Sequence, residues 1–420
     1  MTAQLYQYRP LDTAQRQIRL ITVLPPKDNG DPVLKLEHTA MEDADNAYSA
    51  ISYTWGQDTP SHQVWIGDQY ILLRENIWRF LLHYCRVHFR DMWVDLEEQD
   101  HPRLWIDSIC INQNDTQEKN LQVRLMARIF GQARSVLIWL SQISEQRSPQ
   151  KYDYKSFKRR RGSKNSSRFH YQTSTAHVYN WRSLREIRDR IIPDDLVHLL
   201  RNPYWERLWI VQEIILARAA FIIMGYQLVA AAAVSDALHD DDAHNAFFGA
   251  GEEYSATAYG KDLTLMSVIR KIVNFSGTYK TGRKLPQPLD WLIKDFSSQK
   301  CYDPRDRIFG LLGMTRLSET FDVDYACTIP QLAVKVLEVI KREYLDAQQK
   351  NFNSQPECAS VNLDDLLSAL NLTLEDFVDT VGGRILDSEE IGEPVAILDD
   401  GTEVLTIHGA PRRQPPGIVE

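Results

Sequence analysis

A glutamate lies inside a largely apolar stretch of the chain. Glu213 belongs to residues 206–217, which read ERLWIVQEIILA. A carboxylate in such surroundings costs free energy unless a partner satisfies it. When the stretch is drawn as a helix with about 100° per residue, Glu206 and Glu213 share one narrow polar stripe. Two interpretations stay open: the stripe pairs with a basic side chain such as Arg201 or Arg207, or it lines a cleft.

Polar side chains also follow two strands that the apolar pattern predicts. Ligands of open α/β sheets gather at the carboxyl ends of strands, so these positions are candidates for binding. Gly56, which has no side chain, would let the backbone approach a ligand closely. The alternative is structural, with Asp107 and Asn112 capping the turn and Trp55 filling the core. The first strand end carries Ser52, Tyr53, Thr54, Trp55 and Gly56, and the second carries Asp107, Ser108, Cys110, Asn112 and Gln113.

Other sites of chemistry find little support in the residues. The chain has no GxSxG elbow, no Walker loop and no GxGxxG after a strand. A His/Asp cluster at residues 239–244 is typical of a solvated loop, and its spacing matches no metal site. Cys110 is an alternative nucleophile without a base nearby in the sequence, so a buried inert thiol is the simpler interpretation. We therefore expect no metal and no bound cofactor.

The composition indicates an ordinary globular protein. The chain has 420 residues, of which 43% are hydrophobic and 25% charged, and its formal net charge is −9. Nucleic-acid binders more often carry a basic balance, so we expect no nucleic-acid partner. The one basic cluster, residues 155–168, is typical of a solvated insertion loop, with contact to an acidic partner or nucleic acid as the alternative.

Cysteine usage and hydropathy indicate the compartment. The N-terminus has no apolar signal core, and no run approaches the roughly 18 apolar residues that a membrane span needs. The cysteines are odd in number, irregularly spaced and without a CxxC pair, which favours reduced thiols. We expect a cytoplasmic protein with no membrane partner. The cysteines are Cys85, Cys110, Cys301, Cys327 and Cys358.

Alternating strand and helix patterns predict a parallel α/β sheet. The predicted strands are residues 17–25, 47–56, 103–111, 134–141 and 219–225, with a hairpin at 63–73. The predicted helices between them are residues 74–90, 116–133 with Asp115 or Thr116 as cap, and 202–218 with Asn202 as cap. Farther along, helical patterns occupy residues 262–275, 288–296, 303–314, 328–345 and 362–381, and residues 392–409 predict a hairpin.

These patterns divide the chain into four parts. Residues 1–48 are a β-rich lead-in, and residues 49–225 hold the α/β core with a polar insertion at about 142–200. Residues 226–346 are predicted to be a helical region packed on that core. Residues 347–420 comprise a linker, a helical stretch and the C-terminal hairpin.

Three blocks of this sequence resemble the fungal heterokaryon incompatibility (HET) domain. They are YSAISYTWGQ from residue 48, the long run from Leu104 to Leu140 that starts LWIDSICINQND, and RNPYWERLWIVQEIILAR from residue 201. The flanks YQYRPLD…QIRLITVLPP and DPRDRIFGLLGM…VDY are also similar to that family, so the resemblance covers about residues 5–330. Membership implies non-self recognition between fungal individuals that ends in cell death.

HET domains are in turn similar to the Toll/interleukin-1 receptor (TIR) domain, whose TIR-like or flavodoxin-like parallel sheet is the fold expected for this core. AISYTWG resembles the first TIR strand and its loop, and Trp209 with Glu213 fits the Trp-x-x-x-Glu pattern of a TIR helix. The insertion at 142–200, between strand and helix, departs from the TIR pattern.

Several TIR domains cleave NAD at the nicotinamide–ribose bond, a reaction that builds positive charge on the ribose. By that resemblance, Glu213 would be the catalytic carboxylate and NAD the substrate. Trp209 would pack beneath the cleft, and the residues expected to line the nucleotide are Ser52, Tyr53, Trp55, Gly56 and Asp107. The resemblance also implies activity as a self-associated assembly. Two alternatives remain: a non-enzymatic HET module that signals by assembly or partner binding, and, more remotely, a nucleic-acid contact through residues 155–168.

Overall fold

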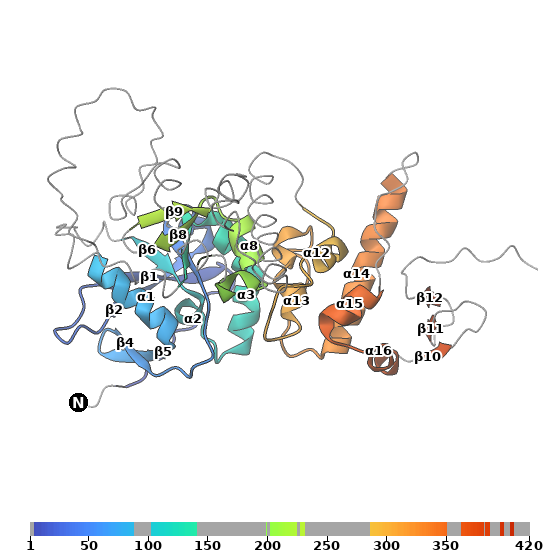
Figure 1. The fold of residues 1–420 in the computed structure, drawn as a ribbon, viewed down its shortest axis with the longest axis horizontal. Helices are drawn as coiled ribbons and strands as arrows, with labels where there is room; N and C mark the ends of the chain where they lie inside the picture. Colours follow the sequence, from blue (N-terminus) through green and yellow to red (C-terminus); the bar gives the residue numbers. More distant parts are fainter. Residues whose placement is uncertain are drawn as a thin grey trace, which may run out of the picture. The chain divides into compact units, whose positions relative to one another are not determined.

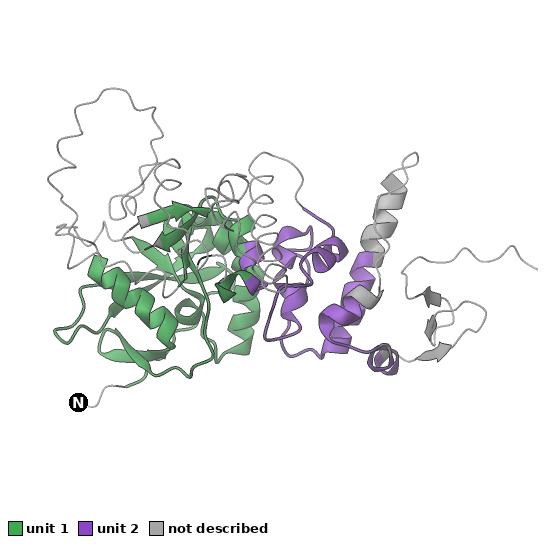
Figure 2. Ribbon diagram, in the orientation of Figure 1, with its two compact units in different colours: residues 1–205, 213–283 green, residues 206–212, 284–420 purple. Residues whose placement is uncertain are grey.

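The computed structural model divides the chain into two compact units (Figure 2). The first consists of Met1–Trp205 and Glu213–Arg283, and the second of Glu206–Gln212 and Lys284–Glu420. The structure describes residues 4–87, 102–140, 199, 202–224, 227–231, 286–350, 363–381, 383–386, 395–398 and 404–406. The basic cluster at 155–168, nearly all of the predicted insertion, the His/Asp cluster at 239–244 and the predicted helix at 262–275 lie outside these residues.

The first unit is built on a mixed sheet (Figure 1). Its strands are β1 (Gln17–Leu24), β2 (Val33–Ala40), β3 (Tyr48–Tyr53), β4 (His62–Ile66), β5 (Gln69–Leu73), β6 (Arg103–Trp105), β7 (Ser135–Trp139), β8 (Ala220–Met224) and β9 (Gln227–Ala230). Its helical segments are η1 (Met41–Ala44), α1 (Glu75–Cys85), α2 (Asp107–Cys110), α3 (Thr116–Gln132), η6 (Pro203–Glu206) and α8 (Ile210–Ile215), and the last two cross into the second unit.

The predicted parallel sheet is confirmed for four adjacent strands, but the sheet as a whole is mixed. Among the described strands the order is β5-β4-β2-β1-β6-β3-β7-β8-β9, and β6, β3, β7 and β8 run parallel to one another. In chain order these four are second, first, third and fourth, as in doubly wound sheets. On either side, β1 pairs antiparallel with both β2 and β6, and β9 pairs antiparallel with β8. The links from β1 to β2 and from β8 to β9 are too short for the crossover that a parallel pair requires.

Helices cover both faces of the parallel strands. Trp139 of β7 packs edge-on against Phe80 of α1, and Trp105 of β6 packs edge-on against Phe130 of α3. In the strand registers these tryptophans align with positions of β3 that are three residues apart. Successive side chains of a strand point to opposite faces, so α1 and α3 lie on opposite sides of the sheet.

Local patterns located most of these elements correctly. Strand β1, the hairpin of β4 and β5 around Gly67, and helices α1 and α3 all lie where the sequence predicts them. Strand β6 is shorter than predicted, because the chain turns into helix α2 directly after Ile106. The predicted cap of α3 is confirmed, since the Asp115 carboxylate accepts hydrogen bonds from the backbone amides of Gln117 and Glu118.

We expect Asp115→Ala to lower the free energy of unfolding by about 1 kcal/mol, because two amides of the first turn of α3 would lose their acceptor. Urea denaturation of both variants and the wild type measures this. Asn114→Ala, one residue earlier and also exposed, is the matched control and should change stability by less than about 0.5 kcal/mol. Equal losses in the two variants would contradict a capping role.

The single helix predicted over residues 202–218 is wrong. Asn202 does start a helical turn, since its side-chain oxygen accepts the amide of Tyr204, but this turn ends at Glu206. The backbone then pairs with Lys300, which donates its amide to Glu206 and accepts the amide of Leu208. These bonds, both within the second unit, replace the helical ones. Glu206 and Glu213 therefore do not form one helical stripe.

The second unit contains mostly helices in its described part. These are α12 (Leu289–Asp295), α13 (Asp306–Phe309), η7 (Leu312–Met314), α14 (Ile329–Lys350), α15 (Leu363–Leu370) and α16 (Leu374–Val381). The predicted C-terminal hairpin is confirmed as antiparallel β11 (Val395–Leu398) and β12 (Val404–Thr406), and β10 (Gly383–Leu386) adds a third strand. Among the described residues, no helix is both long enough and apolar enough to cross a membrane.

Candidate functional site

The buried carboxylate of Glu213 is bonded to a hydroxyl at the end of β3. Ser52 Oγ donates a hydrogen bond to Glu213 Oε2, and the Tyr204 hydroxyl lies 2.6 Å from Ser52 Oγ. A serine hydroxyl carries one proton, so Tyr204 is the donor to Ser52. Glu213 is 3% exposed and Ser52 is 1% exposed. The chain thus satisfies this carboxylate partly through hydroxyls, which the sequence analysis did not consider.

Two basic side chains, Arg201 and Arg207, are the partners that the sequence suggests for Glu213. Arg201 lies outside the described residues. Arg207 belongs to the second unit, where its backbone carbonyl accepts a hydrogen bond from the side chain of Gln299 at 3.2 Å. Glu206 is also in that unit and pairs with Lys300 at 2.5 Å. The two glutamates of the predicted stripe therefore belong to different units.

A second polar cluster joins the ends of β3 and β6. The Tyr53 hydroxyl donates to Asp107 Oδ1 at 2.9 Å and lies 2.6 Å from Ser108 Oγ. Trp55 Nε1 donates to the other oxygen, Asp107 Oδ2, at 2.7 Å. One carboxylate thus holds two aromatic side chains from the β3 end, both of which the sequence analysis singled out.

Strand alternation separates the two clusters. Ser52 and Tyr53 are neighbours on β3, so their side chains leave opposite faces of the sheet. Ser52 faces Glu213, whereas Tyr53 contacts Asp107. The expected wall of Ser52, Tyr53, Trp55 and Gly56 is therefore split between two polar clusters that share the carboxyl end of one strand.

The loop after β3 is held by side chains of α1. Arg74 Nη1 donates to the carbonyl of Gly56 at 2.6 Å, and Asn76 Nδ2 donates to the carbonyl of Thr54 at 2.5 Å. Asn76 Oδ1 in turn accepts the indole N–H of Trp139 at 2.9 Å. Gly56 has φ +82°, a conformation that side chains with a Cβ rarely adopt.

We expect Gly56→Ala to lower the free energy of unfolding by about 2 kcal/mol, because the added Cβ is strained at this φ. It would also lie 2.6 Å from Asp58 Oδ1. Gly30→Ala is the matched control, since Gly30 has φ +89° but open space around its Cβ position. Denaturant titrations should show the larger loss for Gly56→Ala, and a larger loss for Gly30→Ala would refute the steric argument.

Trp209 belongs to the second unit. Its indole nitrogen donates to Asp306 Oδ2 at 3.1 Å, and the Tyr325 hydroxyl donates to Asp306 Oδ1 at 2.6 Å. Burial, followed by the charge of Asp306, raises the pKa of Tyr325. The Asp303 carboxylate accepts hydrogen bonds from both the backbone amide and the side chain of Arg305. Trp209 thus anchors residues 206–212 to the DPRD segment within the second unit.

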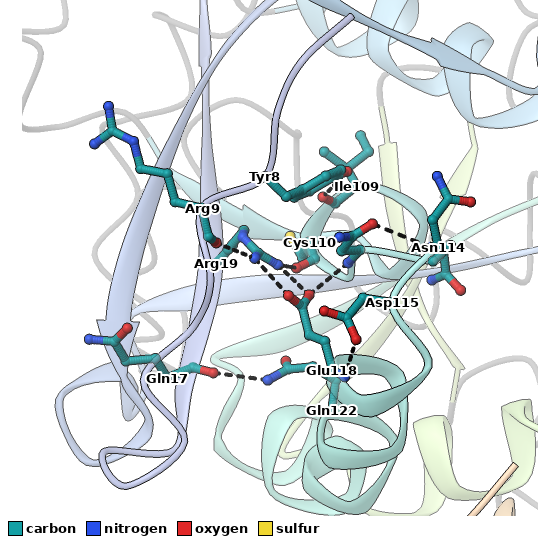
Figure 3. Close-up of polar contacts among 12 residues, drawn as sticks. Tyr8, Arg9, Gln17, Arg19, Ile109, Cys110, Asn114, Asp115, Glu118 and Gln122 are labelled. Carbon is teal, nitrogen blue, oxygen red and sulfur yellow. Dashed lines mark hydrogen bonds and ion pairs between the residues drawn. The ribbon is translucent and has the colours of Figure 1, made fainter. Parts of the chain in front are cut away.

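A buried ion pair joins Arg19 and Glu118, two residues that were not among the predicted site residues (Figure 3). Two guanidinium nitrogens of Arg19 donate to the two carboxylate oxygens of Glu118 at 2.5 and 2.8 Å. Arg19 is 0% exposed and Glu118 is 8% exposed. The signal was present in the sequence, since Arg19 is the one charged residue in the buried strand QIRLITVL.

This ion pair fastens the segment after β6 in place. Arg19 also donates to the carbonyls of Cys110 at 2.8 Å and Arg9 at 2.7 Å, while Glu118 accepts the amide of Asn112 at 2.7 Å (Figure 3). Tyr8 lies against the guanidinium, with its ring centroid 4.8 Å from Arg19 Cζ. The pair therefore ties the N-terminal segment, helix α2 and helix α3 together, and α2 begins with Asp107.

Cys110 and metal binding find no support among the described residues. Cys110 is fully buried, and burial raises the pKa of its thiol to about 12. A nucleophilic cysteine needs a lowered pKa, so the inert interpretation holds. In the described part of the chain, no three His, Cys, Asp or Glu side chains form a group able to hold a metal ion.

Comparison with known families places both polar clusters within one matched region of the sequence. The family model described as heterokaryon incompatibility protein (HET) matches residues 48–213. Residues 48–213 therefore match the HET domain family. The matched region begins with β3 and ends at Glu213, so it contains Ser52, Asp107 and, between them, helix α1.

One curated relative of this chain has heterokaryon incompatibility in its name. Heterokaryon incompatibility protein 6, OR allele, of Neurospora crassa is 28% identical over 257 residues. The match covers 55% of this chain and 36% of the length of that relative. No solved structure matches the chain.

Proposed function

We propose that this HET-domain protein acts in heterokaryon incompatibility as a cell-death effector that hydrolyses NAD through Glu213. The name of the Neurospora relative supports the biological process. One observation carries the chemistry: Ser52, at the carboxyl end of β3, binds the carboxylate of Glu213 inside the matched domain. Ligands of doubly wound sheets bind at that edge, where the strand order reverses.

Strand order supports the TIR-like part of this proposal. The parallel strands β6, β3, β7 and β8 follow the order of the first four strands of a flavodoxin-like sheet. Order reverses between β3 and β7, whose ends carry Ser52 and Trp139. Glu213 follows in the helix that leads to β8. The distance in sequence between β7 and that helix is the departure from a minimal TIR domain.

The reaction assigns each group a role. Water adds to C1 of the ribose, the bond from C1 to the nicotinamide nitrogen breaks, and the products are ADP-ribose, nicotinamide and one proton. Positive charge builds on the ribose as that bond lengthens. The carboxylate of Glu213 stabilises this charge and accepts hydrogen bonds from the ribose hydroxyls. Ser52 orients the carboxylate by donating a hydrogen bond to it, and Tyr204 holds Ser52 in place by donating to its hydroxyl oxygen.

The burial of Glu213 favours a second function. At 3% exposure, the carboxylate meets almost no solvent in this conformation. In a non-enzymatic HET module, the hydrogen-bonded Ser52–Glu213 cluster would stabilise the core, and signalling would come from self-association or partner binding. An enzyme of this kind requires the carboxylate to become accessible, and assembly is the step expected to provide that access.

Incubation of the purified full chain with NAD tests these functions. Chromatographic detection of nicotinamide, at several protein concentrations spanning the assembled and monomeric states, should show turnover that rises steeply with assembly. Glu213→Ala should abolish it. Assembled wild-type protein that leaves NAD intact would reject the enzyme and favour the scaffold. Size-exclusion chromatography on the same samples supplies the assembly state.

A further inference from the structure

An arginine and a tryptophan lie together at the carboxyl end of β3, outside the Ser52–Glu213 cluster. Arg74 Cζ is 5.8 Å from the centroid of the Trp55 ring, which is within the range of cation–π contacts. Both side chains are partly exposed. Neither contributes to the proposed bond-breaking step.

Both side chains of this pair are held in place by hydrogen bonds to other residues of the protein. The indole N–H of Trp55 is bound to Asp107, which also accepts the Tyr53 hydroxyl, so the ring is oriented by a fixed carboxylate. Arg74 uses Nη1 to bind the carbonyl of Gly56 at 2.6 Å. The geometry thus presents a flat ring and a guanidinium together, without either side chain needing to be ordered by a ligand.

The positive charge of Arg74 is uncompensated by any carboxylate among the described residues. Two acidic residues close to Arg74 in the loop and in α1, Asp58 and Glu75, have other partners. Asp58 Oδ2 accepts the backbone amide of Glu75 at 2.8 Å, and the Glu75 carboxylate pairs with Arg79 at 2.6 Å. Arg74 therefore keeps Nε and Nη2 available for an anion, and a guanidinium binds phosphate oxygens with two parallel hydrogen bonds.

We propose that Arg74 and Trp55 form a nucleotide-binding subsite, in which Arg74 binds a phosphate and the Trp55 ring stacks on a heteroaromatic ring of the ligand. Aromatic side chains stack on bases of any sequence, and arginine supplies the charge that phosphate requires. The ligand class is a nucleotide that carries a diphosphate. This choice rests on the proposed function, because NAD contains both a diphosphate and heteroaromatic rings. The pair lies at the same strand end as Ser52 and beside the reversal of strand order, where such sheets bind nucleotides.

Calorimetric titration of the full chain with ADP and with adenosine tests the subsite without any turnover. We expect wild type to bind ADP more tightly than adenosine. Arg74→Ala should weaken ADP binding by about tenfold or more, the effect of one lost charged contact, and leave adenosine binding within about twofold. Trp55→Ala should weaken both. Arg79→Ala, one turn farther along α1 and paired with Glu75, is the matched control and should change neither.

Arg74→Lys guards against misfolding, since it keeps the charge but loses the planar fork and should bind ADP with intermediate affinity. Unchanged ADP affinity in Arg74→Ala, or failure of wild type to bind ADP, would overturn the subsite. Inorganic pyrophosphate is the third probe: if it binds as tightly as ADP and Trp55→Ala leaves ADP binding intact, the stacking role is wrong.

Glu213→Gln separates this inference from the proposed function. This variant should bind ADP like wild type while losing nicotinamide release. Binding of ADP that depends on Arg74, in a protein that never cleaves NAD, would leave the subsite standing and reject the enzyme. If the protein cleaves NAD but Arg74→Ala leaves its ADP affinity unchanged, the enzyme stands and the subsite is rejected.

Discussion

Arg19→Met should lower the free energy of unfolding by about 3–5 kcal/mol, because it leaves the Glu118 carboxylate buried without its cation. Three further hydrogen bonds depend on this pair, since Arg19 also donates to the carbonyls of Cys110 and Arg9, and Glu118 accepts from the amide of Asn112. Equilibrium denaturation of wild type and variant, followed by circular dichroism and by tryptophan fluorescence, measures the loss.

Two comparisons sharpen the ion-pair prediction. The double variant Arg19→Met/Glu118→Leu should recover much of the loss, because two apolar side chains of similar volume bury no charge. Lys35→Met removes the cation of an exposed pair with Glu37 and should cost less than about 1 kcal/mol. A loss for Arg19→Met no larger than that of Lys35→Met would show that the buried pair contributes little to stability.

Glu213→Gln should reduce the rate of nicotinamide release by about 10²–10³-fold, because the amide no longer stabilises positive charge on the ribose. Glutamine has nearly the same shape, and its side-chain oxygen can still accept the hydrogen bond from Ser52. The fold should therefore persist. Steady-state turnover at saturating NAD, combined with a thermal melt of each variant, separates chemistry from stability.

Glu206→Gln is the matched control for this substitution. Glu206 lies seven residues earlier in the same apolar stretch but pairs with Lys300 in the second unit. It should leave turnover unchanged. If Glu213→Gln releases nicotinamide at the wild-type rate, the carboxylate has no catalytic role, and a lowered melting temperature in that variant would assign it to the core.

The position of Arg19 connects stability with the site. Helix α2 begins with Asp107, which orients Trp55, and the last carbonyl of α2 is bound by Arg19. Arg19 lies before the matched family region, which starts at residue 48. Strand β1 therefore supports the matched region structurally, because it supplies the cation that binds the last carbonyl of α2.

Sequence alone determined the elements whose signals are local. Apolar alternation located β1 and the β4–β5 hairpin, 3.6-residue periodicity located α1 and α3, and Asp115 marked the start of α3. The three family blocks were also readable, and they contain Ser52, Asp107 and Glu213. Each of these signals involves residues within a few positions of one another.

Tertiary structure decided the features that depend on residues far apart in the chain. Lys300 interrupts the predicted helix at residues 206–208 from 94 positions away, and Arg19 finds Glu118 across 99 positions. Strand pairing sent Ser52 and Tyr53 to different partners, although they are adjacent in sequence. Backbone and charged groups must be satisfied wherever they become buried, and only the folded chain brings together the groups that satisfy them.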